Sequence, residues 1–277
     1  MRIFAPAFEA NVFGVIAQLV EQRTENPCVP GSIPGGTTKR RDAKASLLFN
    51  KSKAPVHYNS MKRLVIFDLD GTLLNTIADL GTAANHTLSG LGLPQHTMDE
   101  YRLMVGNGMR KLIMRALPQD KADDNAFTEE TLNSFLDYYA QHIDIYTRPY
   151  PGIPKLISDL YNKGYKLAVA SNKIQVGAER LIGTFFPGID FTAVLGNSPE
   201  FPLKPDAAVI EYIMNRAGVT REQTIMVGDS PTDIGTAHNA GIPIIAVSWG
   251  FRPRHELAPA DHIADTAEQL RTLLEKY

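Results

Sequence analysis

The stretch Val65–Thr72 reads VIFDLDGT, an apolar run that ends in two aspartates, a glycine and a threonine. Side chains two residues apart in an extended chain point to the same side, so Asp68 and Asp70 can reach into one site. Gly71 permits a tight turn that brings the backbone close to a ligand. Two crowded carboxylates are costly unless a cation neutralises them, which makes a bound metal the expected companion. An ordinary acidic turn after a strand is the alternative interpretation.

The composition is typical of a globular protein with a sizeable core. The chain has 277 residues, of which 44% are hydrophobic and 21% are charged. Residues 1–60 carry eight Lys or Arg against four Asp or Glu, which leaves 20 against 26 in residues 61–277. We therefore expect no nucleic-acid partner, and no apolar segment approaches the roughly 20 residues that cross a membrane. The single cysteine, Cys28, rules out an intrachain disulfide framework and fits a reducing, cytoplasmic setting.

Residues 1–60 differ from the rest of the chain. They show no sustained helical or strand period, and prolines and glycines interrupt their middle. The segment Asn11–Val20 is apolar enough for a signal core, but acidic residues flank it and no convincing cleavage site follows. The segment Val15–Gly36 resembles peptides that arise when a tRNA gene is translated conceptually. We therefore expect residues 1–60 to be a disordered or spurious leader, with the true start at Met61.

From Met61 onward, short apolar runs alternate with amphipathic stretches, the pattern of an α/β fold with a buried parallel sheet. The pattern predicts a Rossmann-like, doubly wound core. The expected strands are Leu64–Phe67, Lys166–Ala170, Thr192–Leu195, Thr224–Val227 and Ile244–Val247. The helices expected between them are Ile153–Lys163, Gly177–Gly183, Asp206–Ala217 and Thr232–Ala240.

The segment between the first two expected strands has a different, helical character. Its expected helices are Asn75–Leu91, Met98–Leu117 and Thr128–His142, separated by glycines and prolines. This amount of helix exceeds one crossover connection, so we expect an all-α cap inserted after the first strand. The predicted domains are a core of residues 61–75 and 148–277 and a cap of residues 76–147.

Further polar residues stand near the ends of the expected strands, where open parallel sheets bind their ligands. Ser171 and Asn172 follow the second strand, Lys204 precedes a helix, and Asp229 and Asp233 follow the fourth strand. Each has a structural alternative: Ser171 could cap a helix, Lys204 could be a surface lysine, and Asp233 could be a first-turn helix acid. Their joint occurrence in this order predicts one shared site.

Together these motifs resemble the haloacid dehalogenase superfamily of aspartate-nucleophile phosphatases that carry a helical cap. The resemblance spans residues 61–277. It rests on four motifs, which are Asp68-x-Asp70-Gly71-Thr72, Ser171-Asn172, Lys204 and Gly228-Asp229-x-x-x-Asp233. This combination is specific for the superfamily and much less specific for the substrate.

The resemblance implies a role for each motif. Asp68 would attack phosphorus and form an aspartyl-phosphate, and Asp70 would act as general acid and base. Mg²⁺ would be held by the Asp68 carboxylate, the Asp70 backbone carbonyl and Asp229. The phosphate oxygens would be bound by Thr72, Ser171, Asn172 and Lys204. Asp233 would orient a metal-bound water or support Lys204.

A glycine-flanked turn in the cap is the strongest sign of substrate choice. Gly106, Asn107 and Gly108 resemble the equivalent turn of bacterial phosphoglycolate phosphatases, and Arg110 follows at the head of a helix. A plain interhelical turn with solvated cations is the alternative. Asn75-Thr76 departs from these relatives, many of which have Asp-Ser or Asp-Thr there. Trp249 and the residues after it could line the site entrance or serve packing.

The expected reaction is therefore Mg²⁺-dependent hydrolysis of 2-phosphoglycolate, a small phosphorylated metabolite, to glycolate and phosphate. A pyrophosphatase, a nucleotidase, a sugar-phosphate phosphatase and a β-phosphoglucomutase-like mutase would share the core motifs. A non-catalytic binding module is disfavoured because every implied catalytic residue is present. Monomer and homodimer both fit the sequence.

Overall fold

The computed structural model describes residues 63–277, so the expected leader and the start at Met61 lie outside the described residues. A six-stranded parallel sheet forms the centre of this part of the chain, in the order β5-β4-β1-β6-β7-β8. Its strands are β1 (Leu64–Phe67), β4 (Lys166–Ile174), β5 (Ala193–Asn197), β6 (Thr224–Gly228), β7 (Ile244–Val247) and β8 (His262–Ala264). Because β1 pairs with β4 on one side and β6 on the other, their carboxyl ends meet at one edge.

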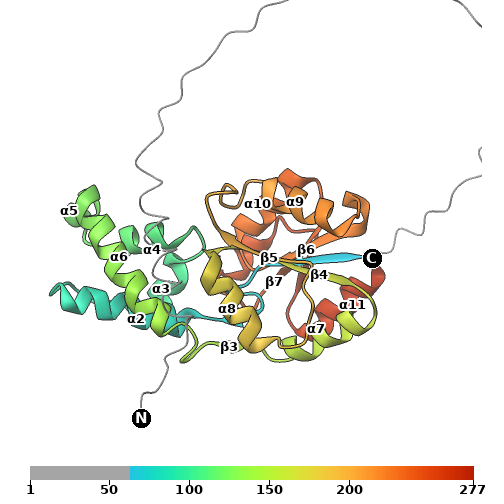
Figure 1. Ribbon diagram of the computed structural model, residues 1–277, viewed down its shortest axis with the longest axis horizontal. Coiled ribbons are helices and arrows are strands. Elements are labelled where there is room, and N and C mark those ends of the chain that lie inside the picture. Colours follow the sequence, from blue (N-terminus) through green and yellow to red (C-terminus); the bar gives the residue numbers. More distant parts are fainter. Residues whose placement is uncertain (1–62) are drawn as a thin grey trace, which may run out of the picture. The chain divides into compact units, whose positions relative to one another are not determined.

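Helices cover both faces of the sheet, as Figure 1 shows. One face carries α9 (Ala208–Ala217) and α10 (Pro231–Ala240), and the other carries α7 (Ile153–Asn162), α8 (Gln175–Phe185) and α11 (Ala267–Lys276). In β1, Leu64 and Ile66 pack with the first group, whereas Val65 and Phe67 pack with the second. A continuous apolar strand is expected where both faces are covered. The predicted doubly wound core is thereby confirmed.

Five consecutive helices form the cap segment. They are α2 (Ile77–Gly90), α3 (Met98–Met104), α4 (Met109–Ala116), α5 (Gln119–Ala122) and α6 (Asn125–Gln141). Two short strands, β2 (Leu74–Asn75) and β3 (Arg148–Pro149), pair antiparallel where the chain leaves and re-enters the core. The helices therefore form an insertion after the first strand of the sheet, and the boundaries 76–147 stay a prediction.

Several elements differ from expectation. The expected helix Met98–Leu117 is two helices, because Val105 is extended and Gly108 has φ +85°. Strand β4 continues through Ile174, so Ser171 and Asn172 lie within a strand whose pairing is irregular after Ala170. The structure adds β8 and α11, together with the short 3₁₀ helices η1 (Arg221–Gln223) and η2 (Arg254–Leu257). The edge strand β8 has only three residues and an exposed histidine, so it lacks the apolar run that marks the inner strands.

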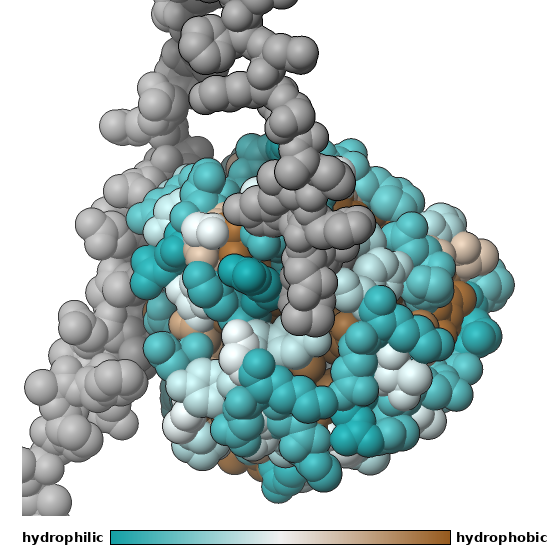
Figure 2. Space-filling view, turned by 90° about the vertical axis from the view of Figure 1, so that its right-hand side faces the viewer, coloured by the Kyte–Doolittle hydropathy of each residue, from teal (hydrophilic) through white to brown (hydrophobic). Residues whose placement is uncertain are grey.

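The surface of the described part is mixed in character. On the face shown in Figure 2, hydrophilic side chains predominate and hydrophobic ones lie among them. Within residues 63–277, no helix is both long enough and apolar enough to cross a membrane.

Candidate active site

The strand ends and the cap turn enclose one pocket. From the core it is lined by Asp68, Asp70, Ser171, Asn172, Lys173, Lys204, Asp229, Ser230, Asp233, Phe251 and Arg252, and from the cap segment by Leu80, Val105, Gly106, Gly108, Met109 and Leu112. Its volume is about 40 Å³. A cavity needs roughly 10–15 Å³ by this kind of measure to hold one water. Three predicted site residues, Thr72, Asn107 and Arg110, do not line it.

Lys204 joins two of the pocket's carboxylates. Its Nζ donates to Oδ1 of Asp68 at 2.8 Å and to Oδ1 of Asp233 at 2.6 Å. Burial raises the pKa of Asp68 to about 7, although the charge of Lys204 opposes the shift. Burial alone would lower the pKa of Lys204, but Asp233 and Asp68 outweigh it and raise that pKa. Lys204 is therefore a permanent cation beside Asp68.

Asn172 fixes the backbone of that lysine. Its Oδ1 accepts from the Lys204 N–H at 2.8 Å, and its Nδ2 donates to the Lys204 carbonyl at 3.1 Å. The same Nδ2 also donates to the carbonyl of Gly106 at 3.3 Å. The side chain of Asn172 thus positions Lys204. The phosphate contact predicted for Asn172 stays a prediction, and its backbone N–H is the group that would make it.

Asp229 occupies a space that two glycines leave open. A Cβ on Gly71 or on Gly250 would lie 2.3 Å from Oδ2 of Asp229. Gly71 also has φ +91°, a conformation that side chains disfavour. The Thr72 hydroxyl donates to Oδ1 of Asp229 at 3.3 Å, and the Phe251 N–H donates to Oδ2 at 2.7 Å. The side chain of Thr72 therefore holds Asp229, and the phosphate contact predicted for Thr72 stays a prediction.

Asp233 is held at the start of α10 by a capping box. The hydroxyl and N–H of Ser230 both donate to Oδ2 of Asp233, at 2.6 and 3.1 Å, and Pro231 occupies the first turn. This arrangement leaves Oδ1 to Lys204. The residue is thus a first-turn helix acid and also a partner of Lys204.

The carboxylates fit a divalent cation. Asp68, Asp229 and Asp233 are buried, and one oxygen from each lies within 4.8 Å of the others. Burial raises the pKa of Asp229 well above its ordinary value, and the charges of Asp68 and Asp233 add to the shift. With Asp70, four carboxylates face the two ammonium groups of Lys173 and Lys204 in the pocket. A hard cation with oxygen ligands would relieve this excess negative charge.

Asp70 has a partner that the sequence analysis did not single out. Nζ of Lys173 donates to Oδ1 and Oδ2 of Asp70 at 3.0 and 3.4 Å, and to the Tyr139 hydroxyl at 2.6 Å. The Lys173 side chain has no exposed surface, whereas the Asp70 side chain is 18% exposed. Lys173 directly follows the Ser171-Asn172 motif, so alternation along β4 could have indicated that it lies on the same side as Ser171.

Hydrogen bonds between the cap turn and the core hold the turn in place. Arg252, after β7, donates to the carbonyls of Leu103 and Val105 at 3.0 and 2.6 Å. Nδ2 of Asn107 donates to the Thr232 hydroxyl of α10 at 3.2 Å. Together with the contact between Asn172 and Gly106, these bonds hold the turn against the core.

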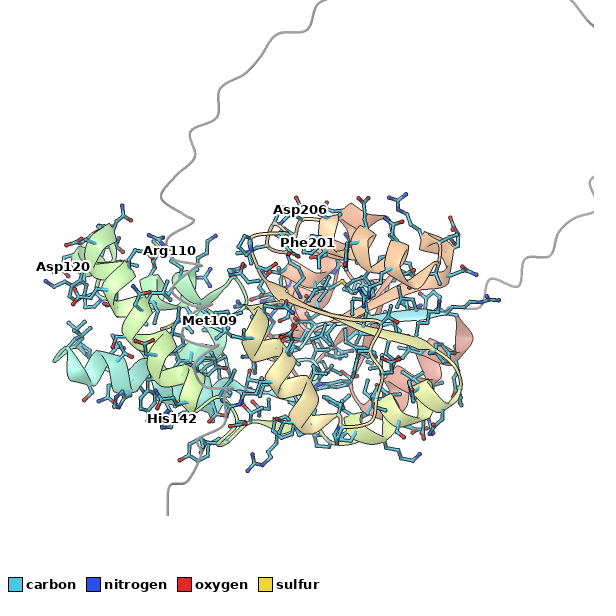
Figure 3. The ribbon with its side chains drawn as sticks, in the orientation of Figure 1. Met109, Arg110, Asp120, His142, Phe201 and Asp206 are labelled. Atoms are coloured by element: carbon cyan, nitrogen blue, oxygen red, sulfur yellow. The ribbon has the colours of Figure 1, made fainter. Side chains whose placement is uncertain are left out.

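Arg110 lies elsewhere in the cap. Its guanidinium donates to Oε1 of Glu129 at 2.5 Å and to Oδ1 of Asn125 at 3.1 Å. Figure 3 shows Met109 nearer the strand ends than Arg110, and Met109 is the one that lines the pocket. A substrate contact of Arg110 stays a prediction, and the cation that lines the pocket beside the turn is Arg252. Trp249, three residues earlier, serves packing: it donates to the Thr72 carbonyl at 3.1 Å and lies against Tyr150.

Comparison with known proteins places this site in a family. Residues 65–247 match the haloacid dehalogenase-like hydrolase family. A phosphoglycolate phosphatase of Mesorhizobium japonicum is 37% identical over 193 residues, which cover 69% of this chain and 85% of that protein. A phosphoglycolate phosphatase of Pseudomonas putida is 35% identical over 221 residues, covering 78% and 79%.

The solved structures agree with these relatives. The crystal structure of a predicted phosphoglycolate phosphatase from Haemophilus somnus superposes with a TM-score of 0.70 at 29% identity, covering 76% of this chain and 97% of that one. The named relatives are phosphatases, which supports the same class of activity for this chain. The resemblance predicted from the four motifs is confirmed, and the chain belongs to the haloacid dehalogenase-like hydrolase family.

Proposed function

We propose that this chain hydrolyses phosphomonoesters with the help of Mg²⁺ and through an aspartyl-phosphate on Asp68, and that its substrate is 2-phosphoglycolate. The observation that carries the proposal is the placement of Asp68. Its carboxylate lines the pocket, Nζ of Lys204 lies 2.8 Å from Oδ1, and Asp70 lies two residues along the same strand end. A nucleophile, an adjacent cation and a proton-transferring group are thereby brought together.

The proposed chemistry has two steps. In the first, an oxygen of Asp68 bonds to phosphorus, the ester P–O bond breaks, and Asp70 gives a proton to the leaving oxygen. In the second, Asp70 takes a proton from water, which attacks phosphorus and breaks the bond to Asp68. Positioned proton transfer of this kind contributes about 10²- to 10⁴-fold in rate.

The remaining residues bind charge. Ser171 and Lys204 line the pocket and would hold the non-bridging phosphate oxygens. The carboxylates of Asp68 and Asp229 and the carbonyl of Asp70 would hold Mg²⁺. When bound, Mg²⁺ would neutralise part of the charge on the phosphate and the carboxylates. Asp233 keeps Lys204 in place from the opposite side.

The pocket favours a small, doubly anionic substrate. Gly106 and Gly108 of the cap turn line the same pocket as Asp68 and Lys204. Gly108 and Met109 stand at the start of α4, where backbone N–H groups have no partner within the helix. These amides and the guanidinium of Arg252 would bind a carboxylate. The phosphoglycolate phosphatases among the relatives support the same substrate.

A panel of phosphoesters tests the proposal. Phosphate release with Mg²⁺ would be measured for 2-phosphoglycolate, pyrophosphate, nucleoside monophosphates and sugar phosphates, with Asp68→Asn as the blank. We expect kcat/KM for 2-phosphoglycolate to exceed the others by at least about a hundredfold, a transition-state difference of about 2.7 kcal/mol. A flat profile would contradict the substrate, and isomerisation of a sugar phosphate without phosphate release would contradict the hydrolase mechanism.

A further inference from the structure

Lys173 is a buried cation whose place in the reaction is not explained by phosphate or metal binding. Its side chain is fully buried, and its carboxylate partner is Asp70. Lys204, the other buried lysine of the site, lies between Asp68 and Asp233. Lys204 thus pairs with the first aspartate of the Asp68-x-Asp70 motif, and Lys173 pairs with the second.

The surroundings of Lys173 leave its ammonium group little freedom. The Tyr139 hydroxyl accepts from Nζ at 2.6 Å, and Nζ also lies 4.9 Å from the centre of the Tyr139 ring. A Cβ on Gly177 would lie 3.6 Å from Cε of Lys173, so this glycine of α8 lies beside the lysine side chain. Burying an ammonium group is costly unless it is paired with an opposite charge. Loss of the contact with Asp70 would therefore destabilise the folded state.

Tyr139 and Lys173 come from different parts of the molecule. Tyr139 belongs to α6 of the cap and is buried, whereas Lys173 belongs to β4 of the core. The hydrogen bonds from Lys173 to Tyr139 and to Asp70 therefore connect the cap with the carboxylate that is proposed to exchange protons.

We propose that Lys173, held by Tyr139 of the cap, is a positioning residue that fixes the Asp70 carboxylate where it transfers a proton to the leaving group. The inference rests on the proposed phosphatase function. In the step concerned, the O–H bond of Asp70 breaks, the proton goes to the ester oxygen, and the ester P–O electron pair stays on that oxygen. Lys173 keeps its own protons and acts through Asp70.

Three phosphoesters separate positioning from the other possible roles. 2-Phosphoglycolate and ethyl phosphate both have alkoxide leaving groups that need a proton, and only the first has a carboxylate. p-Nitrophenyl phosphate has a leaving group that departs without one. For Lys173→Met we expect kcat/KM to fall by about 10- to 100-fold for both alkyl esters and by less than about threefold for p-nitrophenyl phosphate.

Milder variants guard against misfolding. Tyr139→Phe removes only a hydroxyl and should show the same leaving-group pattern with a loss of about three- to tenfold. Tyr101→Phe is the matched control, because the buried Tyr101 hydroxyl of the cap donates to Asn85 at 2.7 Å and makes no contact with the site. It should leave all three values unchanged.

Two results would overturn the inference. An equal loss on all three esters would make Lys173 a structural residue, and a loss on 2-phosphoglycolate alone would make it a carboxylate-binding residue. A wild-type enzyme that does not prefer 2-phosphoglycolate to ethyl phosphate would contradict the proposed substrate and not the role of Lys173. The comparison of ethyl phosphate with p-nitrophenyl phosphate would then still decide the role of Lys173.

Discussion

The core site and the cap turn are built on different principles. In the core site, the side chain of Lys204 contacts those of Asp68 and Asp233 at the carboxyl edge of the sheet. At the cap turn, the core residues Arg252 and Asn172 bind backbone carbonyls of the cap. A change at Asp68 or Lys204 therefore removes chemistry, whereas a change at the contacts of the turn shifts the place of a backbone segment. Catalysis should thus depend on the side chains of the core site more steeply than substrate choice depends on the side chains that hold the turn.

The steepest loss is expected at the nucleophile. Asp68→Asn should lower kcat by at least about 10⁴-fold, because the amide cannot form the covalent intermediate. Asp70→Asn should lower kcat by about 10²- to 10⁴-fold and still bind Mg²⁺, since its expected ligand atom is a backbone carbonyl. Steady-state kinetics and titration calorimetry with Mg²⁺ measure the two effects. Substantial activity in Asp68→Asn would contradict the expectation that catalysis depends steeply on the side chains of the core site.

The stability of the metal-free protein should depend on pH through the same core site. Burial raises the pKa of Asp68 from 3.8 to about 7. Between these values the folded state binds more protons than the unfolded state, so the contribution of Asp68 to the free energy of unfolding falls as pH rises, by at most about 4 kcal/mol. The raised pKa of Asp229 acts in the same direction. Denaturation in EDTA at pH 5 and pH 8 measures the change, and Mg²⁺ should restore stability at pH 8. If Asp68→Asn shows the same pH dependence, the effect arises elsewhere.

The two glycines around Asp229 offer a smaller test of the core. A Cβ in Gly250→Ala would lie 2.3 Å from Asp229 atoms and displace that carboxylate. We expect the Mg²⁺ concentration for half-maximal activity to rise about 10- to 100-fold. Gly183→Ala is the matched control, because a Cβ there meets no atom within 4 Å. Unchanged Mg²⁺ dependence in Gly250→Ala would show that Asp229 is not needed for the metal.

Two arginines test the cap with the smallest expected effect. Arg252→Gln should raise KM for 2-phosphoglycolate by about tenfold, because Arg252 lines the pocket and holds the cap turn. Arg110→Gln should change KM by less than about threefold, because its guanidinium is paired with Glu129. p-Nitrophenyl phosphate, which lacks the carboxylate, is the comparison substrate for both variants. The opposite ranking would support the substrate contact that the sequence predicts for Arg110.

The core could be predicted from the sequence because each inner strand is a short apolar run. The bounds of Leu64–Phe67 and Ile244–Val247 agree with the structure, and the aspartates after the first strand lie in the pocket. A parallel sheet places the carboxyl ends of all its strands at one edge. Motifs that follow different strands could therefore be assigned to one site from the strand pattern alone.

The cap was less predictable because its contacts join residues without a shared pattern. Arg110 follows the glycine turn in sequence, yet on its helix it meets Glu129 of α6. Arg252 lies 147 positions from Val105, and no local period relates the two. Lys173 could have been suspected from its place after Asn172, but its contact with Tyr139 depends on where α6 of the cap lies relative to β4.

The central claim is that Asp68 carries the phosphoryl group. The Asp70→Asn variant, supplied with Mg²⁺ and p-nitrophenyl phosphate, should form the intermediate without needing an acid and break it down slowly for want of a base. After an acid quench, mass spectrometry of proteolytic peptides should find the phosphoryl group on the peptide that contains Asp68. Phosphorylation of another residue, or turnover with no phosphorylated peptide, would contradict the account.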